Sequence, residues 1–410
     1  MGSEPKSLKK VAFFYATFPR PTETFVRREL RALIDLGVTP TVFSIWRGNK
    51  SWEGQKIERF HFARLLTLIF WLPYWAFKKP KPFRDVLLAL WNKPCPNFQN
   101  WNETFLGLGF ALVEAHRIKS KNFQVLHGVW ATMPATAAYG ISNLIDIPFS
   151  MGAHAYDLFR QGGDWLLREK FEHASFIRTS SKSSANRLYA LGLDRGKVTV
   201  IRRGLSRWPQ RSSFQLIDSN KLSLLCVGRL VEKKGYFLLL QILEILHQRQ
   251  KVDFRLKIVG GGPLRKSLQK EIDRIGLTEY IELAGSKSEQ EVGELLLESD
   301  IMLFTGIIAS NGDRDGIPNV VPEAMSAGCL VIASCFAGAS EAFIDGVSGF
   351  SENPYQPDSW VELLEDFTGR PAQYEKIRRK AQSEVRERFH VKRTAQELKK
   401  AFELVIKANP

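Results

Sequence analysis

The sequence predicts an α/β protein built from two doubly wound domains, each with a parallel sheet covered by helices. Short apolar segments typical of buried strands alternate with amphipathic stretches typical of helices, which is the pattern of repeated βαβ units. The chain has 410 residues, more than the roughly 250–300 residues that a single hydrophobic core supports. Its 44% hydrophobic and 25% charged residues exclude a disordered or fibrous chain.

The first half opens with a buried strand over residues 11–15, a helix over residues 24–36 and a strand over residues 40–45. We expect residues 50–103 to be irregular and a helix to follow near residues 104–118. The other strands predicted in this half lie at residues 124–128, 148–152, 175–179 and 197–201.

The second half repeats the alternation. Its predicted strands lie at residues 222–227, 254–259, 281–284, 301–304 and 330–333. Its predicted helices lie at residues 235–248, from 264 onward, at 289–298 and 320–327, and near 372–388 and 392–407. Gly, Ser and Pro cluster in residues 203–219, where we place the hinge. The predicted domains are therefore residues 1–205 and 206–390, with residues 391–410 a C-terminal helix that can pack back on the first domain.

Charge and tryptophan are concentrated in the first half of the chain. Residues 1–210 hold 31 Lys and Arg against 15 Asp and Glu, whereas the remaining residues hold 27 against 28. Nine of the ten tryptophans also lie in the first half. Such a surface suits a membrane, an anionic acceptor or a nucleic acid. The alternative is a solvated basic surface over core tryptophans.

The four cysteines form no CxxC pair, which argues against structural zinc and a disulfide scaffold and favours a reducing, cytoplasmic location. No segment reaches the roughly 20 apolar residues of a spanning helix, and the polar N-terminus is unlike a signal peptide. The apolar run at residues 65–77 is followed by Lys78, Lys79 and Lys81. It is a candidate for a peripheral segment on an anionic membrane, unless it packs inside the first domain.

The strongest motif runs from Asp315 to Glu323, between the predicted strand at residues 301–304 and a helix. Ligands of parallel sheets bind beyond the carboxyl ends of the strands, where helix N-termini offer free N–H groups. The N–H groups expected to face a phosphate belong to Gly316, Ile317, Asn319 and Val320. The two carboxylates can accept hydrogen bonds from sugar hydroxyls, or simply stabilise the helix dipole as surface acids.

Two further strand ends carry candidate residues. Arg229 and Lys234 lie between a strand and the start of a helix, and together they suit a diphosphate. His154 and Asp157 follow the strand at residues 148–152 in a loop of small residues. A lone His is more often structural, but its position at a strand's carboxyl end favours a functional role.

These motifs resemble those of the family 4 glycosyltransferases of the GT-B fold, along almost the whole chain, and particularly bacterial enzymes that build exopolysaccharides and lipid-linked glycans. The family's Glu-x7-Glu motif matches Asp315 and Glu323, and its Gly-Arg-Leu…Lys-Gly signature matches residues 228–235. Its Ile-Val-Gly-x-Gly-Pro and Gly-x-x-Glu segments match residues 258–263 and 338–341. Residues 18–25 match the start of one branch, and His154 matches the family's active-site histidine.

The resemblance implies two Rossmann-like domains, with the acceptor bound by the first and a nucleotide sugar by the second. Arg229 and Lys234 would hold the donor diphosphate, Glu323 the ribose, and Asp315 with the following backbone the transferred sugar. Gly262 belongs to the donor site, and His154 would lie beside the reacting sugar. The implied acceptor or phosphate loop contains Thr22, Glu23, Thr24 and Asp157.

Two positions depart from the family pattern. Asp315 replaces the family's first Glu, so the donor sugar can differ. The usual Asn-Gly-[Ile/Val]-Asp after the last first-half strand is here Arg203-Gly204-Leu205-Ser206.

The predicted function is a retaining, metal-independent glycosyltransferase with a UDP-, GDP- or ADP-sugar donor and a glycan or lipid-linked acceptor. It would act in exopolysaccharide or cell-envelope glycan biosynthesis, in the cytoplasm or peripherally on the inner face of the membrane. We expect no cofactor and no metal, because Pro322 occupies the position where a calcium loop needs Glu. A sugar-nucleotide epimerase of the same fold is one alternative. A basic nucleic-acid-binding protein is the other, although no nucleic-acid-binding signature is present.

Overall fold

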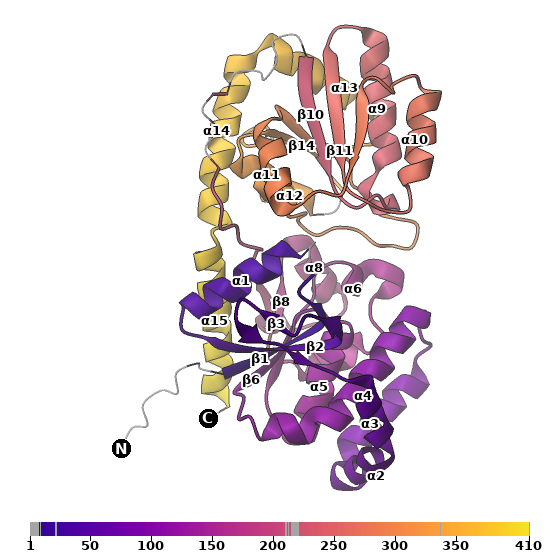
Figure 1. Ribbon diagram of the computed structural model, residues 1–410, viewed down its shortest axis with the longest axis vertical. Coiled ribbons are helices and arrows are strands. Elements are labelled where there is room, and N and C mark those ends of the chain that lie inside the picture. Colours follow the sequence, from indigo (N-terminus) through magenta and orange to yellow (C-terminus); the bar gives the residue numbers. More distant parts are fainter. Residues whose placement is uncertain are drawn as a thin grey trace. The chain divides into compact units, whose positions relative to one another are not determined.

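The computed structural model describes residues 8, 10–20, 23–209, 211, 213–214, 221–336 and 338–409. It divides into unit 1, made of Met1–Gly204 and Val391–Pro410, and unit 2, made of Leu205–His390. Each unit contains a parallel sheet flanked by helices, so the predicted α/β class with two doubly wound domains is confirmed (Figure 1).

Unit 1 contains a seven-stranded sheet in the order β5-β2-β1-β6-β7-β8-β9, and every pairing in it is parallel. Its strands are β1 (Lys10–Phe18), β2 (Thr39–Gly48), β5 (Glu58–Arg59), β6 (Val125–Gly128), β7 (Phe149–Gly152), β8 (Ile177–Thr179) and β9 (Val198–Val200). The chain moves outward from β1 through β2 to β5 and then returns to the other side of β1 with β6. Ligands of such sheets bind near this reversal, at the carboxyl ends of the strands.

Alternate residues of β1 pack on opposite faces of the sheet, as the period of two in a strand requires. Ala12 and Phe14 pack on the face covered by α4 (Phe98–Lys119) and α5 (Met133–Ile145). Val11 and Phe13 pack on the face covered by α1 (Thr24–Asp35) and the C-terminal helix α15 (Val391–Ala408). The shorter elements of the unit are β3 (Ser51–Trp52), β4 (Gln55–Lys56), α6 (Tyr156–Phe159), η2 (Arg160–Gly162), α7 (Leu167–His173), α8 (Lys182–Ala190) and η3 (Arg195–Lys197).

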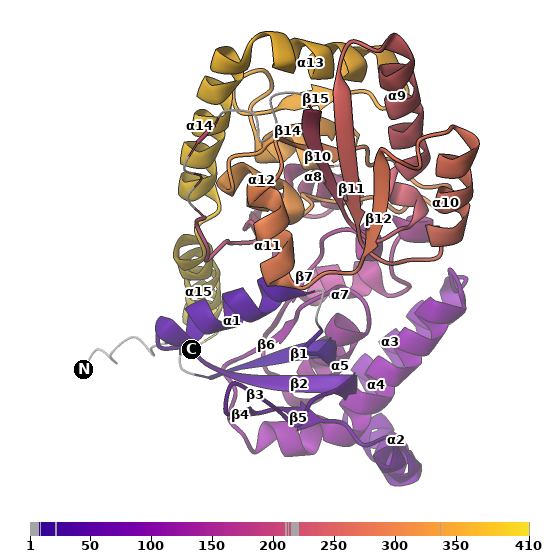
Figure 2. The same cartoon turned by 45° about the horizontal axis from the view of Figure 1, so that its top comes forward.

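The expectation that residues 50–103 are irregular is wrong. Besides three short strands, this stretch contains η1 (Phe62–Thr67), α2 (Leu68–Lys78) and α3 (Pro80–Asn92), and α4 begins at Phe98. The Lys-Pro sequence at residues 79–80 ends one helix and starts the next, because Pro at the first position of a helix needs no N–H partner. The helix α2 packs beside both α3 and α4 in unit 1 (Figure 2).

Unit 2 contains a six-stranded parallel sheet in the order β12-β11-β10-β13-β14-β15. Its strands are β10 (Lys221–Val227), β11 (Asp253–Val259), β12 (Ile281–Gly285), β13 (Ile301–Phe304), β14 (Leu330–Ser334) and β15 (Phe350–Glu352). The strand order reverses at β10, which lies between β11 and β13. The loops after β10 and β13 contain the two strongest sequence motifs.

Helices cover both faces of the sheet in unit 2. One face packs against α9 (Tyr236–Arg249), α10 (Arg265–Arg274) and α13 (Pro357–Gly369), and the other against α11 (Glu289–Leu297), α12 (Val320–Ser326) and α14 (Pro371–Arg388). Two short turns, η4 (Glu232–Lys234) and η5 (Ala339–Ala342), follow β10 and β14. Within the described ranges, every helix is too short or too polar to cross a membrane.

Candidate active site

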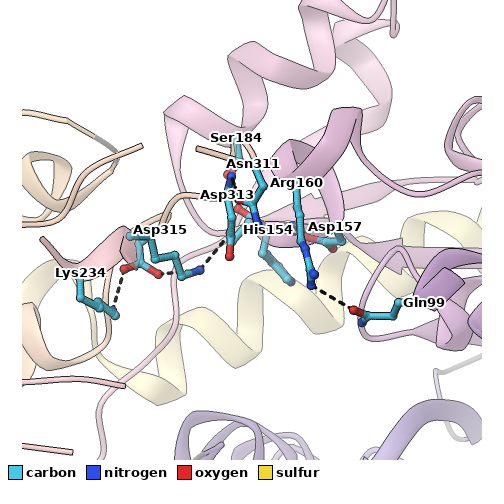
Figure 3. Close-up of polar contacts among 11 residues, drawn as sticks. Gln99, His154, Asp157, Arg160, Ser184, Lys234, Asn311, Asp313 and Asp315 are labelled. Atoms are coloured by element: carbon cyan, nitrogen blue, oxygen red, sulfur yellow. Dashed lines mark hydrogen bonds and ion pairs between the residues drawn. The ribbon is translucent and has the colours of Figure 1, made fainter. Parts of the chain in front are cut away.

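The carboxyl ends of β10 and β13 bring two lysines and two aspartates together. Lys234 Nζ lies 2.6 Å from Asp315 Oδ2, and Lys233 Nζ lies 3.0 Å from Asp313 Oδ1 and 3.2 Å from Asp315 Oδ1 (Figure 3). Burial favours a raised pKa for Asp315, but Lys234 and Lys233 outweigh it and lower that pKa. Asp315 is therefore held ionised by two lysines.

The sequence identified Lys234 and Asp315 but not their contact, and it missed Lys233. Lys233 is buried and joins both carboxylates, so it belongs to the same cluster. The feature of the sequence that could have indicated Lys233 is its position directly before Lys234. The contact could not be read from the sequence, because about 80 residues separate the lysines from the aspartates.

Arg229 lies in the loop between β10 and η4, is exposed, and makes no ion pair with any residue that the structure describes. Gly228 and Gly262 explain how the neighbouring loops approach. A Cβ on Gly262 would lie 2.4 Å from the Leu230 carbonyl oxygen, and one on Gly228 would lie 3.2 Å from Lys234 Cε. The loops after β10 and β11 are also joined by a hydrogen bond of 2.9 Å from Leu230 N–H to the Gly261 carbonyl.

The segment after Asp315 contains backbone N–H groups that the described part of the fold does not use, and their predicted contact with a phosphate stays a prediction. The N–H groups of Gly316, Ile317 and Asn319 have no backbone acceptor within the described part of the chain. The helix α12 begins at Val320, and Glu323 lies in its first turn, half-buried. A Cβ on Gly338 would lie 2.8 Å from the Gly316 carbonyl carbon, so the loop after β14 can pack on this segment only with glycine there.

In unit 1, His154 follows β7 and Asp157 is the second residue of α6. The Asp157 carboxylate accepts hydrogen bonds from the backbone N–H groups of Ala131, His154 and Ala155, over 2.8–3.2 Å. Burial raises the pKa of Asp157, and these backbone bonds oppose the rise. Asp157 therefore positions the histidine loop, and its predicted contact with acceptor or phosphate stays a prediction.

His154 is buried against a guanidinium. Arg203 Nη2 donates to His154 Nε2 over 2.7 Å, and because a guanidinium can only donate, we assign the imidazole proton to Nδ1. His154 Nδ1 is buried and has no hydrogen-bond partner in the described part of the chain. Burial lowers the pKa of His154, Arg203 and Arg178 lower it further, and the Val129 carbonyl opposes them, so the ring is neutral.

Arg203 belongs to a buried charge network that sequence reasoning missed. Glu29 on α1 accepts from Arg178 on β8 over 2.6 Å and lies 3.5 Å from Arg203 Nη1. Burial favours a raised pKa for Glu29, but Arg178 and Arg203 lower it overall. The Glu29 carboxylate is therefore the shared counter-charge of both guanidiniums. Burial, and next the positive charge of Arg178, lower the pKa of Arg203 to about 10. The only signal in the sequence was the departure from the family pattern at Arg203.

The remaining predicted loop residues are only partly placed. Thr22 lies outside the described residues, Thr24 begins α1, and Glu23 Oε1 lies 3.5 Å from Arg20 Nη1. Asp157 also lines a small polar pocket with Gln99 and Arg160, whose side chains are hydrogen-bonded over 3.0 Å (Figure 3).

Comparison with known proteins assigns the fold and the class of enzyme. Residues 209–384 match the sequence profile of the family described as "Glycosyl transferases group 1". The chain is 25% identical over 374 residues to the amylovoran biosynthesis glycosyltransferase AmsK of Erwinia amylovora, covering 83% of this chain and 86% of the relative. It is 26% identical over 383 residues to the putative colanic acid biosynthesis glycosyltransferase WcaL of Salmonella typhimurium, covering 88% and 90%.

Two solved structures share the fold. The sucrose-phosphate synthase of Thermosynechococcus elongatus superposes with a TM-score of 0.72 at 14% identity, covering 98% of this chain and 100% of that one. Anabaena HepE, solved with UDP and glucose, superposes with a TM-score of 0.68 at 16% identity, covering 95% and 98%. The two parallel sheets, the family match in unit 2 and the named relatives together identify this chain as a glycosyltransferase of the GT-B fold.

Proposed function

We propose that the protein is a retaining, family 4 glycosyltransferase that transfers a sugar from a nucleotide-sugar donor to a glycan or lipid-linked acceptor. AmsK and WcaL are named for the biosynthesis of extracellular polysaccharides, which supports a role in exopolysaccharide or cell-envelope glycan biosynthesis. Both relatives are named as transferases, which favours transfer over the epimerase alternative.

The cluster of Lys233, Lys234 and Asp315 beside Arg229 carries this proposal. A buried lysine needs a counter-charge, and Asp315 supplies it where no donor is bound. A donor diphosphate would take over Lys234 and recruit Arg229, which has no carboxylate partner in the described chain. Asp315 would then be released from Lys234 to accept a hydrogen bond from a hydroxyl of the transferred sugar.

The chemical step breaks the bond between C1 of the sugar and the phosphate oxygen, and the nucleoside diphosphate leaves with the electron pair. The acceptor hydroxyl bonds to C1 on the same face, and its proton passes to the leaving phosphate. The lysines and the backbone N–H groups after Asp315 supply positive charge where this oxygen develops negative charge. The proposal therefore needs no metal ion and no cofactor.

His154 acts at the sugar in this proposal. Its Nδ1 is buried and makes no hydrogen bond of good geometry among the described residues, although the Val129 carbonyl acts on the ring. The ring is neutral because burial and Arg203 disfavour protonation. It can therefore donate one hydrogen bond to a sugar hydroxyl without adding a charge.

Unit 1 also carries an apolar surface on η1, α2 and α3, to which we assign peripheral binding to the inner face of the cytoplasmic membrane. Phe77 is 90% exposed and Trp91 is 88% exposed, whereas Trp75 is buried and donates from Nε1 to the Leu112 carbonyl over 2.8 Å. Lys78 and other basic residues follow the apolar face in sequence. Exposed aromatics with adjacent cations suit the headgroup region of an anionic bilayer.

The test of the transferase proposal is a donor screen on the full-length protein. UDP-, GDP- and ADP-sugars are compared for thermal stabilisation and for slow hydrolysis, with and without EDTA. We expect one nucleotide class to stabilise the protein and to be hydrolysed at the same rate in EDTA. The proposal is wrong if no nucleotide sugar binds. Its metal-free form is wrong if EDTA abolishes hydrolysis and Mg²⁺ or Mn²⁺ restores it.

A further inference from the structure

A cavity of about 580 Å³ lies in unit 1 at the carboxyl ends of β1, β2 and β5. Its volume falls in the range of roughly 300–1,000 Å³ that is typical of small-molecule sites. The carboxyl edge of a parallel sheet is also where such ligands bind. No residue of this cavity takes part in the donor cluster or in the His154 network.

Two arginines line the cavity without a carboxylate partner. Arg47 is exposed and Arg59 is half-buried, and neither makes an ion pair or a side-chain hydrogen bond with any residue in the described ranges. The neighbouring Glu58 does not neutralise them, because it is paired with Arg117 at 3.2 Å and Lys121 at 2.8 Å. Two free guanidiniums at one cavity favour a ligand with phosphate oxygens, which they can bind bidentately.

The wall that presents Arg47 is held close to β1. Gly48 has φ 140°, and a Cβ there would lie 2.1 Å from the Phe18 carbonyl oxygen. Ser44 Oγ also accepts a hydrogen bond from Phe18 N–H over 3.0 Å. The end of β2 is therefore fixed against β1, so the arginine leaves the sheet from a rigid position.

The rim of the cavity is aromatic and continues into the apolar helix surface. Trp46 and Phe62 are both exposed and contact each other edge to face, with ring centroids 5.5 Å apart. Phe62 is the first residue of the 3-10 helix η1, and Leu66 in η1 and Phe70 and Phe77 in α2 are also exposed. These exposed apolar residues from Phe62 to Phe77, here called the apolar strip, thus start at a residue that lines the cationic cavity.

We propose that this cavity binds the phosphate of a lipid-linked glycan acceptor, with Arg47 and Arg59 on the phosphate and the lipid chain along the strip from Phe62 to Phe77. The inference rests on the proposed transferase function and specifies its acceptor as a phosphate-bearing amphiphile. A ligand that carries only a phosphate would leave the apolar strip exposed, and a ligand that is only an alkyl chain would leave the arginines without a partner. A ligand that has both a phosphate and a lipid chain would cover the strip and pair with the arginines.

The experiment measures binding of farnesyl diphosphate, inorganic diphosphate and farnesol to the full-length protein by calorimetry. We expect farnesyl diphosphate to bind at least about tenfold more tightly than either partial ligand. The double variant Arg47→Ala/Arg59→Ala should lose at least tenfold in affinity for farnesyl diphosphate. Arg168→Ala, which removes an exposed arginine on α7 outside the cavity, is the matched control and should bind like wild type.

Two further variants separate the parts of the site. Phe70→Ser should weaken farnesyl diphosphate but leave inorganic diphosphate unchanged, because it shortens only the apolar strip. Lys234→Ala removes a diphosphate ligand of the donor cluster, so farnesyl diphosphate that is bound in the cavity should remain bound in this variant. If Lys234→Ala abolishes farnesyl diphosphate binding, or if the double arginine variant binds normally, the proposal is wrong.

Two further measurements separate a failure of the acceptor-cavity proposal from a failure of the transferase proposal. Nucleotide-sugar hydrolysis by the double arginine variant should equal that of wild type, so a loss of farnesyl diphosphate binding with normal hydrolysis supports the cavity. Absence of any nucleotide-sugar binding in wild type would count against the transferase proposal alone. Vesicles of phosphatidylglycerol without farnesyl diphosphate should bind the variant as well as wild type. An equal loss there would show a phospholipid headgroup site and overturn the acceptor assignment.

Discussion

The carboxyl ends of the two sheets hold their positive charges in opposite states. In unit 2, Lys233 is buried, Lys234 is half-buried, and both are ion-paired with Asp313 or Asp315. In unit 1, Arg47 and Arg59 line an open cavity and have no carboxylate partner in the described chain. A buried cation must keep a counter-charge, whereas a cation facing a solvent-filled cavity need not.

This difference teaches how each site would select its ligand. The lysine cluster can bind a phosphate only by exchanging it for Asp315, so phosphate binding and release of the carboxylate are coupled. The arginine pair can capture a phosphate without displacing any group. Two sheets of the same type would thus bind phosphate in different ways. In unit 2 the phosphate would replace a carboxylate at the lysines, and in unit 1 it would bind arginines that have no carboxylate partner in the described chain.

The largest expected effect concerns turnover in unit 1. His154→Ala should lower kcat about 100- to 1,000-fold, the usual cost of losing one preorganised donor to a developing charge. Affinity for the nucleoside diphosphate should stay within a few-fold, because the diphosphate ligands lie in unit 2. Steady-state kinetics with the donor found in the screen measures both values. Wild-type turnover in the variant would remove His154 from the site.

The next effect tests the exchange in unit 2. Arg229→Ala and Lys234→Ala should each weaken nucleotide-sugar binding by about 1.5–3 kcal/mol, typical of a hydrogen bond to a charged group. Asp315→Asn should instead leave the affinity for free nucleoside diphosphate equal or higher, because Lys234 loses its competing carboxylate. Lys287→Ala, which removes an exposed pair with Glu291, is the control. Calorimetry that shows no loss in the Arg229 and Lys234 variants would refute the assignment.

A smaller effect tests why His154 is neutral. Burial and then Arg203 lower the pKa of His154, so Arg203→Met, which removes that positive charge, should raise this pKa. Arg178 and His127 also act on the ring, Asp157 accepts from the His154 backbone N–H, and Glu29 is paired with Arg178, and all four remain in place. Because the neutral ring is the active donor, activity should be lost at a higher pH than in wild type as the pH falls through the raised pKa.

The pH dependence of kcat/KM and the histidine NMR titration measure this shift. Arg203→Lys keeps a charge and a donor and should restore the wild-type profile. An unchanged histidine pKa in Arg203→Met would show that burial alone keeps the ring neutral. A merely structural role for Arg203 would lower stability without moving the profile.

The sequence predicted the strands well where they are fully buried. Residues 301–304 were predicted as a strand and form β13, because four consecutive apolar residues inside a covered sheet leave little ambiguity. The prediction failed at α2 and α3, where the structure leaves most apolar side chains exposed. No residue of α3 is buried, so a pattern that assumes apolar residues face a core does not apply.

The site was predictable only loop by loop. Strand ends indicated Lys234, Asp315 and His154, because the carboxyl edge of a parallel sheet is where ligands bind. Contacts between distant segments were not accessible. Glu29 and Arg178 are 149 residues apart in the chain, and no local pattern reports that they meet.

The smallest expected effect per residue is on membrane binding by the apolar surface of unit 1. It tests whether the positive charges of unit 1 face an anionic ligand, unlike the ion-paired lysines of unit 2. Lys78 and Lys81 should each contribute about 1 kcal/mol to binding an anionic bilayer, so removing one charge weakens partitioning about fivefold. Lys79 and Arg84 should contribute less, because Lys79 Nζ lies 2.6 Å from Asp146 Oδ2 and Arg84 Nη2 lies 3.5 Å from Asp85 Oδ1. Lys79→Gln is therefore the internal control for Lys78→Gln and Lys81→Gln. Sedimentation with anionic and neutral vesicles at two salt concentrations measures the partitioning.

The sedimentation should show binding to anionic vesicles only, weakened by salt, because exposed charges are screened within about 10 Å at 0.1 M. Phe77→Ser should weaken binding at both salt concentrations, since burial of an apolar side chain does not depend on screening. If wild type remains in the supernatant with anionic vesicles at low salt, membrane binding fails. The exposed face of α2 and α3 then has to be covered by another protein surface, and a soluble acceptor becomes the better assignment.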